Sequence, residues 1–250
     1  MRKLIINPNY LKLLNEYKLD NYQAIKSTQR GEIVEDNAKR EIRKIILNDE
    51  VLYLKRTKTE KILSAIEQLL LGRTPHSKPY TEMLHAKLLQ QAGIAVMEVV
   101  AAGEHTQFGL PKGGFILSKE VPGQDGENLY SAANALERIA ICKALGALMA
   151  RLHSKGFFAT TRLKDVFGET NSAGSLTFKL IDRETRTPHI KKLTAKRALN
   201  SLITGFRRQK RAGSSFSNDE QNSFAQAYCA EINQLIAITP AEISQVFKFQ

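Results

Sequence analysis

Tryptophan is absent from this chain of 250 residues, and cysteine occurs only at Cys142 and Cys229. Two thiols without a short spacing between them form neither a metal cluster nor a disulfide framework, which favours a reducing compartment. The sequence also lacks an apolar run of about eighteen residues, the length that a membrane-spanning helix needs. Its first residues, "MRKLIINPNYLKLL", have too short an apolar core for a signal peptide and no small-residue cleavage site. We therefore expect a cytoplasmic protein, which can still lie on the inner face of the cytoplasmic membrane.

Acidic charge is scarce. Asp and Glu number 25 against 37 Lys and Arg, which gives a net charge of +12 and a pI of about 9.7. Such a surface attracts polyanions, whether nucleotide phosphates, nucleic acid or an anionic membrane. Residues 185–218 contain no acid but nine cations, namely Arg186, Lys191, Lys192, Lys196, Arg197, Arg207, Arg208, Lys210 and Arg211. This segment predicts a polyanion-binding surface, and a solvated helix face is the plainer alternative.

The first half of the chain predicts a small sheet with helices attached. A short amphipathic helix is expected around residues 10–17. Alternation over residues 42–46 and 51–55, about a turn at Asn48-Asp49, predicts a β-hairpin. Two helices should follow, over residues 58–71 and from a cap at Ser77 to a stop at Gly93. The runs "IAVMEVVAAGEH" and "GGFILSKEV" then indicate two further strands.

The second half should be mostly helical. The turn-rich stretch "VPGQDGEN" is typical of a hinge between lobes. One long helix is predicted over residues 128–155, and another helical stretch begins after "SSFSNDEQ". Residues 1–120 would then form one lobe, residues 121–127 a hinge, and residues 128–250 a helical lobe.

Three charged residues have the order that phosphoryl transfer requires. The reaction needs a cation on the nucleotide phosphates, a carboxylate that holds this cation, and a carboxylate for magnesium. Lys55 ends the strand "VLYLK", and Glu82 lies on the second helix, where it can pair with Lys55. Asp182, in "KLIDR", follows an apolar strand as a metal ligand would. Each residue alone is compatible with a solvated charge, and the set favours a nucleotide site.

The succession of blocks resembles the lipopolysaccharide-core kinases, the Kdo/WaaP family, which share the protein-kinase-like fold. The similarity covers most of the chain and is carried by "KLDNYQAI", "NAKREI", "VLYLKR", "PHSKPYTEMLHAKLLQQAGIAV", "GFILSKEVPGQD", "LMARLHSKG", "LIDRETR" and "SSFSNDEQNSFAQAY". It implies Lys55 as the phosphate lysine, Glu82 as its partner, Glu120 and Val121 near the adenine hinge, and Asp182 as the magnesium ligand. ATP and Mg²⁺ are the implied cofactors.

The phosphate loop lacks glycine. "EDNAKRE" contains none, so a close backbone cradle for phosphates is less available. Lys39 and Arg40 can supply charge in place of amide contacts, and an ordinary polar turn is an equal alternative. We expect nucleotide binding to be weak.

The catalytic loop departs from the family. Members carry a His-Arg-Asp-like triplet soon after "LHSKG", with a metal-binding Asn or His five residues later, whereas this chain reads "FFATTRLKDVF". One alignment puts Thr161 and Val166 at the two positions, and the other puts Arg162 and Phe167 there. Neither register supplies a base. Asp165 is the nearby carboxylate that can substitute, although a capping role in the next turn is the simpler interpretation.

Five histidines are scattered through the chain without a metal-ligand spacing. His153, in "RLHSKG", occupies a position where kinase-like folds commonly bury a histidine that braces the catalytic loop. We therefore interpret His153 as structural.

These observations predict an α+β, two-lobed protein-kinase-like fold, with a small antiparallel-sheet N-lobe and a mostly helical C-lobe. The first functional hypothesis is an ATP-dependent kinase that phosphorylates a Kdo or heptose sugar of lipopolysaccharide or another anionic glycolipid. The alternative is a pseudokinase that binds a partner protein, a glycolipid or a nucleic acid through its basic surface. A small-molecule kinase of the aminoglycoside-phosphotransferase kind is a third possibility, against which the missing base also counts.

Overall fold

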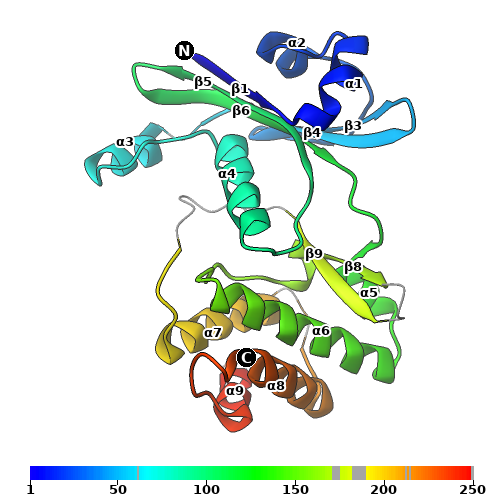
Figure 1. Cartoon of the computed structure of the whole chain (residues 1–250), viewed down its shortest axis with the longest axis vertical. Coiled ribbons are helices and arrows are strands. Elements are labelled where there is room, and N and C mark those ends of the chain that lie inside the picture. Colours follow the sequence, from blue (N-terminus) through cyan, green and yellow to red (C-terminus); the bar gives the residue numbers. More distant parts are fainter. Residues whose placement is uncertain (61, 171–174, 182–189, 212, 214, 249–250) are drawn as a thin grey trace. The chain divides into compact units, whose positions relative to one another are not determined.

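The computed structural model describes residues 1–60, 62–170, 175–181, 190–211, 213 and 215–248. They divide into two compact units (Figure 1). The first contains Met1–Leu89 and Met97–Val121, and the second contains Gln90–Val96, Pro122–Ile181 and the described residues from 190 onward. Residues 90–96, which the sequence assigned to the first lobe, belong to the second unit, where Val96 and Leu180 form a parallel bridge.

A six-stranded sheet forms the body of the first unit, in the order β1-β5-β6-β4-β3-β2. All five strand pairs are antiparallel, as predicted. The strands are β1 (Arg2–Ile6), β2 (Glu32–Asp36), β3 (Arg40–Leu47), β4 (Glu50–Thr57), β5 (Val99–Gln107) and β6 (Leu110–Lys119).

The predicted hairpin is formed by β3 and β4. Ile42 lies opposite Lys55, and Ile46 lies opposite Val51. Asn48 occupies the turn with a φ of 51°, a left-handed conformation that asparagine tolerates. The hydroxyl of Tyr17 donates to the Asn48 side chain at 2.7 Å, which ties this turn to the N-terminal helical segment.

The two faces of β4 have different surroundings because side chains alternate along a strand. Leu52 and Leu54 are buried on the face covered by α1 (Leu11–Glu16) and α2 (Tyr22–Ser27), together with Leu14 and Ile25. Lys55 belongs to the opposite face. Burial of the apolar face against the N-terminal helices therefore fixes the direction in which Lys55 points.

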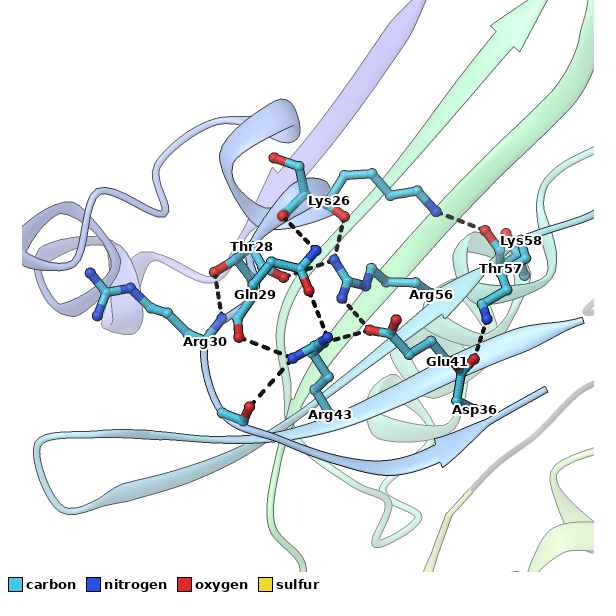
Figure 2. Close-up of polar contacts among 12 residues, drawn as sticks. Lys26, Thr28, Gln29, Arg30, Asp36, Glu41, Arg43, Arg56, Thr57 and Lys58 are labelled. Atoms are coloured by element: carbon cyan, nitrogen blue, oxygen red, sulfur yellow. Dashed lines mark hydrogen bonds and ion pairs between the residues drawn. The ribbon is translucent and has the colours of Figure 1, made fainter. Parts of the chain in front are cut away.

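Figure 2 shows a polar network that extends the buried face of β4. Arg56 donates to the carbonyls of Lys26 at 2.7 Å and Thr28 at 2.9 Å, and it pairs with Glu41. Arg43 donates to Glu41 at 2.6 Å. Burial raises the pKa of Glu41, but the two guanidinium groups outweigh it and hold that pKa below its usual range. The network holds the segment after α2 against β3 and β4.

Two helices follow β4, α3 (Ile62–Leu70) and α4 (Lys78–Gln91). The hydroxyl oxygen of Ser77, predicted to cap α4, has no hydrogen-bond partner among the described residues. Instead, the fully buried Glu104 accepts the Ser77 amide at 3.2 Å and lies 2.9 Å from His76 Nδ1 and 3.3 Å from Lys3 Nζ. Burial raises the pKa of Glu104, but His76, the Ser77 amide and Lys3 keep it below its usual range. A carboxylate on β5 thus anchors the start of α4.

The second unit contains a three-stranded antiparallel sheet and most of the helices. The sheet has the order β7-β8-β9, formed by β7 (Gln124–Asp125), β8 (Val166–Thr170) and β9 (Leu176–Leu180). The single helix predicted over residues 128–155 is wrong, because the structure has α5 (Gly126–Ala132) and α6 (Ala135–Ser154). Asn134 accepts the Glu137 amide at 3.1 Å while the Glu137 carboxylate accepts the Asn134 amide at 2.8 Å. This capping box starts a new helix.

Three C-terminal helices complete the second unit, α7 (Ala195–Arg211), α8 (Asn218–Ile232) and α9 (Pro240–Phe247). α6 and α8 approach so closely that a Cβ on Gly146 would lie 2.4 Å from the carbonyl oxygen of Phe224. The rings of Phe206 and Phe247 contact that of Phe224, and the Phe216 ring contacts those of Phe206 and Phe247, with ring centroids between 4.3 and 6.3 Å apart. This aromatic core packs α7, α8 and α9 together.

Candidate active site

An ion pair between Lys55 and Glu82 is present on the face of the six-stranded sheet opposite α1 and α2. Lys55 Nζ lies 2.8 Å from Glu82 Oε2, and the two side chains are 12% and 3% exposed. Lys55 comes from β4 and Glu82 from the second turn of α4. A buried carboxylate at this distance holds the ammonium in one position, as the sequence predicted for this pair.

A cavity of about 390 Å³ lies beside Lys55. Its walls come from β2, the turn before β3, the end of β4 and the start of α4, and they are formed by Glu35, Asn37, Lys39, Arg40, Lys55, Thr57, Thr59, Lys78 and Pro79. The structure therefore brings together three residues that the sequence singled out, Lys39, Arg40 and Lys55. Lys78, at the start of α4, and Thr57 and Thr59, at and after the end of β4, were missed because single polar residues at the ends of helices and strands carry no distinctive signal.

The turn at the cavity mouth is organised by Asn37. Its side-chain oxygen accepts the backbone amides of Lys39 at 2.8 Å and Arg40 at 3.0 Å. Both amides are thus occupied within the turn, so the glycine-poor loop does not offer them to a ligand. An anion at this turn would therefore have to be held by the side chains of Lys39 and Arg40, and the ordinary polar turn that the sequence left open fits the Asn37 contacts equally well.

The cavity is strongly cationic. Four of its nine lining residues are basic and one, Glu35, is acidic. Glu35 pairs with Arg40 at 3.0 Å, which leaves the balance positive. Several cations lining one cavity suit an anion with several charges, such as a polyphosphate.

Glu120 and Val121 do not line this cavity. Glu120 accepts a hydrogen bond from the Tyr53 hydroxyl at 3.2 Å and lies 3.6 Å from Lys44 Nζ. Burial, followed by the Glu120 contact, raises the pKa of Tyr53. Glu120 thus makes structural contacts with β3 and β4, and the adenine-hinge role of both residues stays a prediction.

The predicted metal ligand, Asp182, lies outside the described residues. The described chain reaches Ile181, whose amide donates to the carbonyl of Asp165 at 3.0 Å. Within the described ranges, no three His, Cys, Asp or Glu side chains come together as a metal site. The magnesium site therefore stays a prediction.

Asp165 closes the catalytic-loop segment as a cap. Its carboxylate accepts the backbone amide of Arg162 at 2.9 Å and the guanidinium of Arg162 at 2.9 and 3.1 Å. These bonds cap the start of the 3₁₀ turn η2 (Leu163–Asp165), where Arg162 is the N-cap residue, and they engage both carboxylate oxygens. This is the capping alternative that the sequence left open, and the catalytic role of Asp165 stays a prediction. Thr161, at the usual base position in one alignment, is buried.

His153 braces the same segment from the core of the second unit. Its Nδ1 lies 2.7 Å from the Tyr228 hydroxyl and its Nε2 lies 3.0 Å from the Ser201 hydroxyl. Ser201 donates to the carbonyl of Phe158, so Nε2 carries the proton and Nδ1 accepts from Tyr228. The Phe158 ring stacks on the imidazole at 4.9 Å. The predicted structural role of His153 is confirmed.

The basic segment contributes one face of α7. Lys196, Arg207, Arg208, Lys210 and Arg211 are exposed. Arg208 also donates to the Thr160 hydroxyl at 2.8 Å, so this face borders the catalytic-loop segment. Helix α7 thus presents cations beside the segment that contains Thr160.

No protein-family model and no curated protein sequence matches the chain. Solved structures match its fold. WaaP in complex with acyl carrier protein aligns with a TM-score of 0.63 and 15% identity, over 91% of this chain and 89% of that one. An aminoglycoside-3'-phosphotransferase of type VIII aligns with a TM-score of 0.54 and 12% identity, over 97% and 99%. The chain therefore has a two-lobed protein-kinase-like fold similar to that of WaaP. None of the described helices is long and apolar enough to cross a bilayer.

Proposed function

We propose that this protein is a kinase-like phosphotransferase that binds magnesium-ATP beside Lys55 and phosphorylates a Kdo or heptose sugar on an anionic, lipid-linked acceptor at the cytoplasmic face of the membrane. The observation that carries the proposal is the buried Lys55–Glu82 pair at the wall of a cationic cavity. The similarity of the fold to that of an aminoglycoside phosphotransferase supports a nucleotide site beside this pair.

The residues of the first unit divide the work of nucleotide binding. Lys55, oriented by Glu82, contacts the phosphates, and Lys39 and Arg40 add charge from the turn whose amides Asn37 occupies. Asp182 is the proposed magnesium ligand. Bound there, Mg²⁺ would offset the negative charge on the transferred phosphoryl group. Because the usual amide cradle is missing, affinity for ATP should be low.

The missing base limits the rate. General-base catalysis typically contributes a factor of about 10² to 10⁴, and Asp165 is engaged by Arg162. We infer that the acceptor hydroxyl loses its proton to water or to the substrate, with orientation supplying most of the rate enhancement. The cations of α7 would hold the phosphates and carboxylates of the acceptor.

A nucleotide-binding pseudokinase is the second candidate. It is favoured by the engagement of both Asp165 oxygens and by the burial of Thr161. Both candidates require nucleotide binding, and they differ in turnover.

A thermal-shift titration with ATP, with and without MgCl₂, tests the shared requirement. A ligand that binds only the folded state raises the melting temperature with the logarithm of its concentration. We expect magnesium-dependent stabilisation of the wild type by ATP. Lys55→Met and Asp182→Ala should each lower the apparent affinity for ATP by about tenfold or more. Lys119→Met should behave as the wild type does, because Lys119 lies on the same sheet but does not line the cavity.

Transfer of labelled γ-phosphate to lipopolysaccharide-core acceptors then separates the candidates. Turnover that Lys55→Met abolishes supports the kinase. Binding without turnover on any acceptor supports the pseudokinase. No stabilisation at millimolar nucleotide would exclude both.

A further inference from the structure

Helix α3 exposes an unusual amount of apolar surface. Leu63 and Leu70 are 84% and 83% exposed, and Ile62, Ile66, Leu69 and the following Leu71 are also exposed. Sixteen large apolar side chains are exposed among the described residues, and six of them lie in this stretch of ten. Single exposed leucines are ordinary, but a cluster of this kind marks an interaction surface.

The apolar side chains share one face of the helix. At about 100° per residue, Ile62, Leu63, Ile66, Leu69 and Leu70 fall within roughly a third of its circumference. Ala65, on another side, is buried at 4% exposure. The helix therefore packs against the first unit through a small residue and directs its leucines and isoleucines outward. Figure 1 shows α3 at the periphery of this unit.

The chemistry of this face suits a lipid surface better than a protein partner. Residues that dominate binding between proteins are chiefly Trp, Tyr and Arg, and α3 contains none of them. Leucine and isoleucine on one face, with cations at the flanks, are typical of helices that lie in a membrane interface. Lys61 and Arg73 flank the helix in the sequence, with Glu67 the one acid between them, and Arg73 is exposed just after the helix. With a net charge of +12, the chain is complementary to an anionic leaflet.

We propose that α3 is a membrane-docking helix, which inserts Leu63 and Leu70 into the interfacial region of an anionic bilayer. Basic charge brings the protein to the surface, and the apolar face supplies the second, short-range signal that stable attachment needs. The site is separate from the nucleotide cavity, which no residue of α3 lines. The inference goes beyond phosphoryl transfer and stands without it.

The absence of tryptophan allows a direct test in the intact protein. Leu63→Trp places the single tryptophan of the chain on α3, and Leu136→Trp places it on α6, where Leu136 is 79% exposed. Vesicles of phosphatidylglycerol and phosphatidylcholine should shift the emission of Leu63→Trp to the blue, and brominated acyl chains should quench it at least twofold. Leu136→Trp should show neither change. Equal responses of the two variants, or no response of Leu63→Trp, would overturn the proposal.

Flotation with the same vesicles measures what α3 contributes. The wild type should float with anionic vesicles and not with pure phosphatidylcholine. The bound fraction of the double variant Leu63→Glu with Leu70→Glu should be at least tenfold lower. The control Leu136→Glu should float as the wild type does. Undiminished flotation of the double variant contradicts the proposal. So does a dimeric wild type that this variant renders monomeric, since α3 would then cover a second copy. The ATP-dependent thermal shift of the double variant should be unchanged, which separates this outcome from failure of the nucleotide site.

Discussion

We expect Lys55 and Glu82 to be strongly coupled in their contributions to stability, because the pair is buried and not merely because the two charges are close. At 2.8 Å and an effective dielectric constant of about 20, the attraction of two unit charges is about 6 kcal/mol, most of which desolvation offsets. Removing one partner of a buried pair typically costs about 3 to 5 kcal/mol, because the other charge stays in a poorly solvated place. We therefore expect Lys55→Met and Glu82→Leu each to destabilise the fold by about this amount.

A double-mutant cycle isolates the pair, and the chain contains a matched control. Lys119 and Glu50 are also 2.8 Å apart on the same sheet, but their side chains are 40% and 36% exposed. The buried cycle should give a coupling of about 1 to 3 kcal/mol. The exposed cycle should give about 0 to 1 kcal/mol, because water screens that pair.

Urea unfolding of the four proteins of each cycle measures both couplings under the same conditions. In a chain of 250 residues, a loss of 3 kcal/mol lowers the melting temperature by roughly 6 to 12 °C, which is easily resolved. Equal couplings for the two pairs would refute the argument that the burial of Glu82 gives Lys55 its fixed position.

Other parts of the structure give further expectations. Gly114→Ala should lower the free energy of unfolding of the first unit by about 1 to 3 kcal/mol in urea, because the alanine Cβ would lie 2.1 Å from Ser77 Oγ. Adding Ser77→Gly should restore part of this stability. If it restores none, the contact with Ser77 is not the cause. Tyr228→Phe should cost about 1 to 3 kcal/mol, because it removes the proton donor of the buried His153 Nδ1; unchanged stability would contradict the proton assignment. Burial lowers the pKa of Lys26 to about 8 in the folded protein, against about 10.4 in the unfolded chain. Between these two pH values the unfolded chain binds more protons than the folded protein. The free energy of unfolding of the wild type should therefore rise with pH in this range. Lys26→Met should lack this rise, which amounts to at most about 3 kcal/mol, and parallel pH profiles from urea unfolding of the two proteins would disprove the shift.

Several features were predictable because their signals are local. The alternation of residue types on either side of Asn48 indicated the β3–β4 hairpin. Lys55 at the end of a predicted strand and Glu82 on a predicted helix indicated that the two side chains could pair. The break between α5 and α6 was also readable from Asn134 and Glu137 three residues later, and it was missed because the apolar periodicity continues past it.

Other features depend on residues far apart in the chain. Strand β1 was not predicted, since "MRKLII" becomes a strand by pairing with β5, where Arg2 lies opposite His105. Ser77 was predicted to cap α4 through its side chain, whereas Glu104 on β5 holds its amide.

The sequence by itself determined the fold class, the cationic lining of the cavity beside Lys55 and the absence of a His-Arg-Asp-like triplet after "LHSKG". These follow from periodicity, composition and the order of residue types. Tertiary structure decided that Asn37 occupies the amides of the phosphate turn, that Arg162 engages Asp165, and that the apolar face of α3 points away from the core. Such properties depend on which groups meet after folding, because a hydrogen bond or an exposed face exists only once the chain has placed its partners.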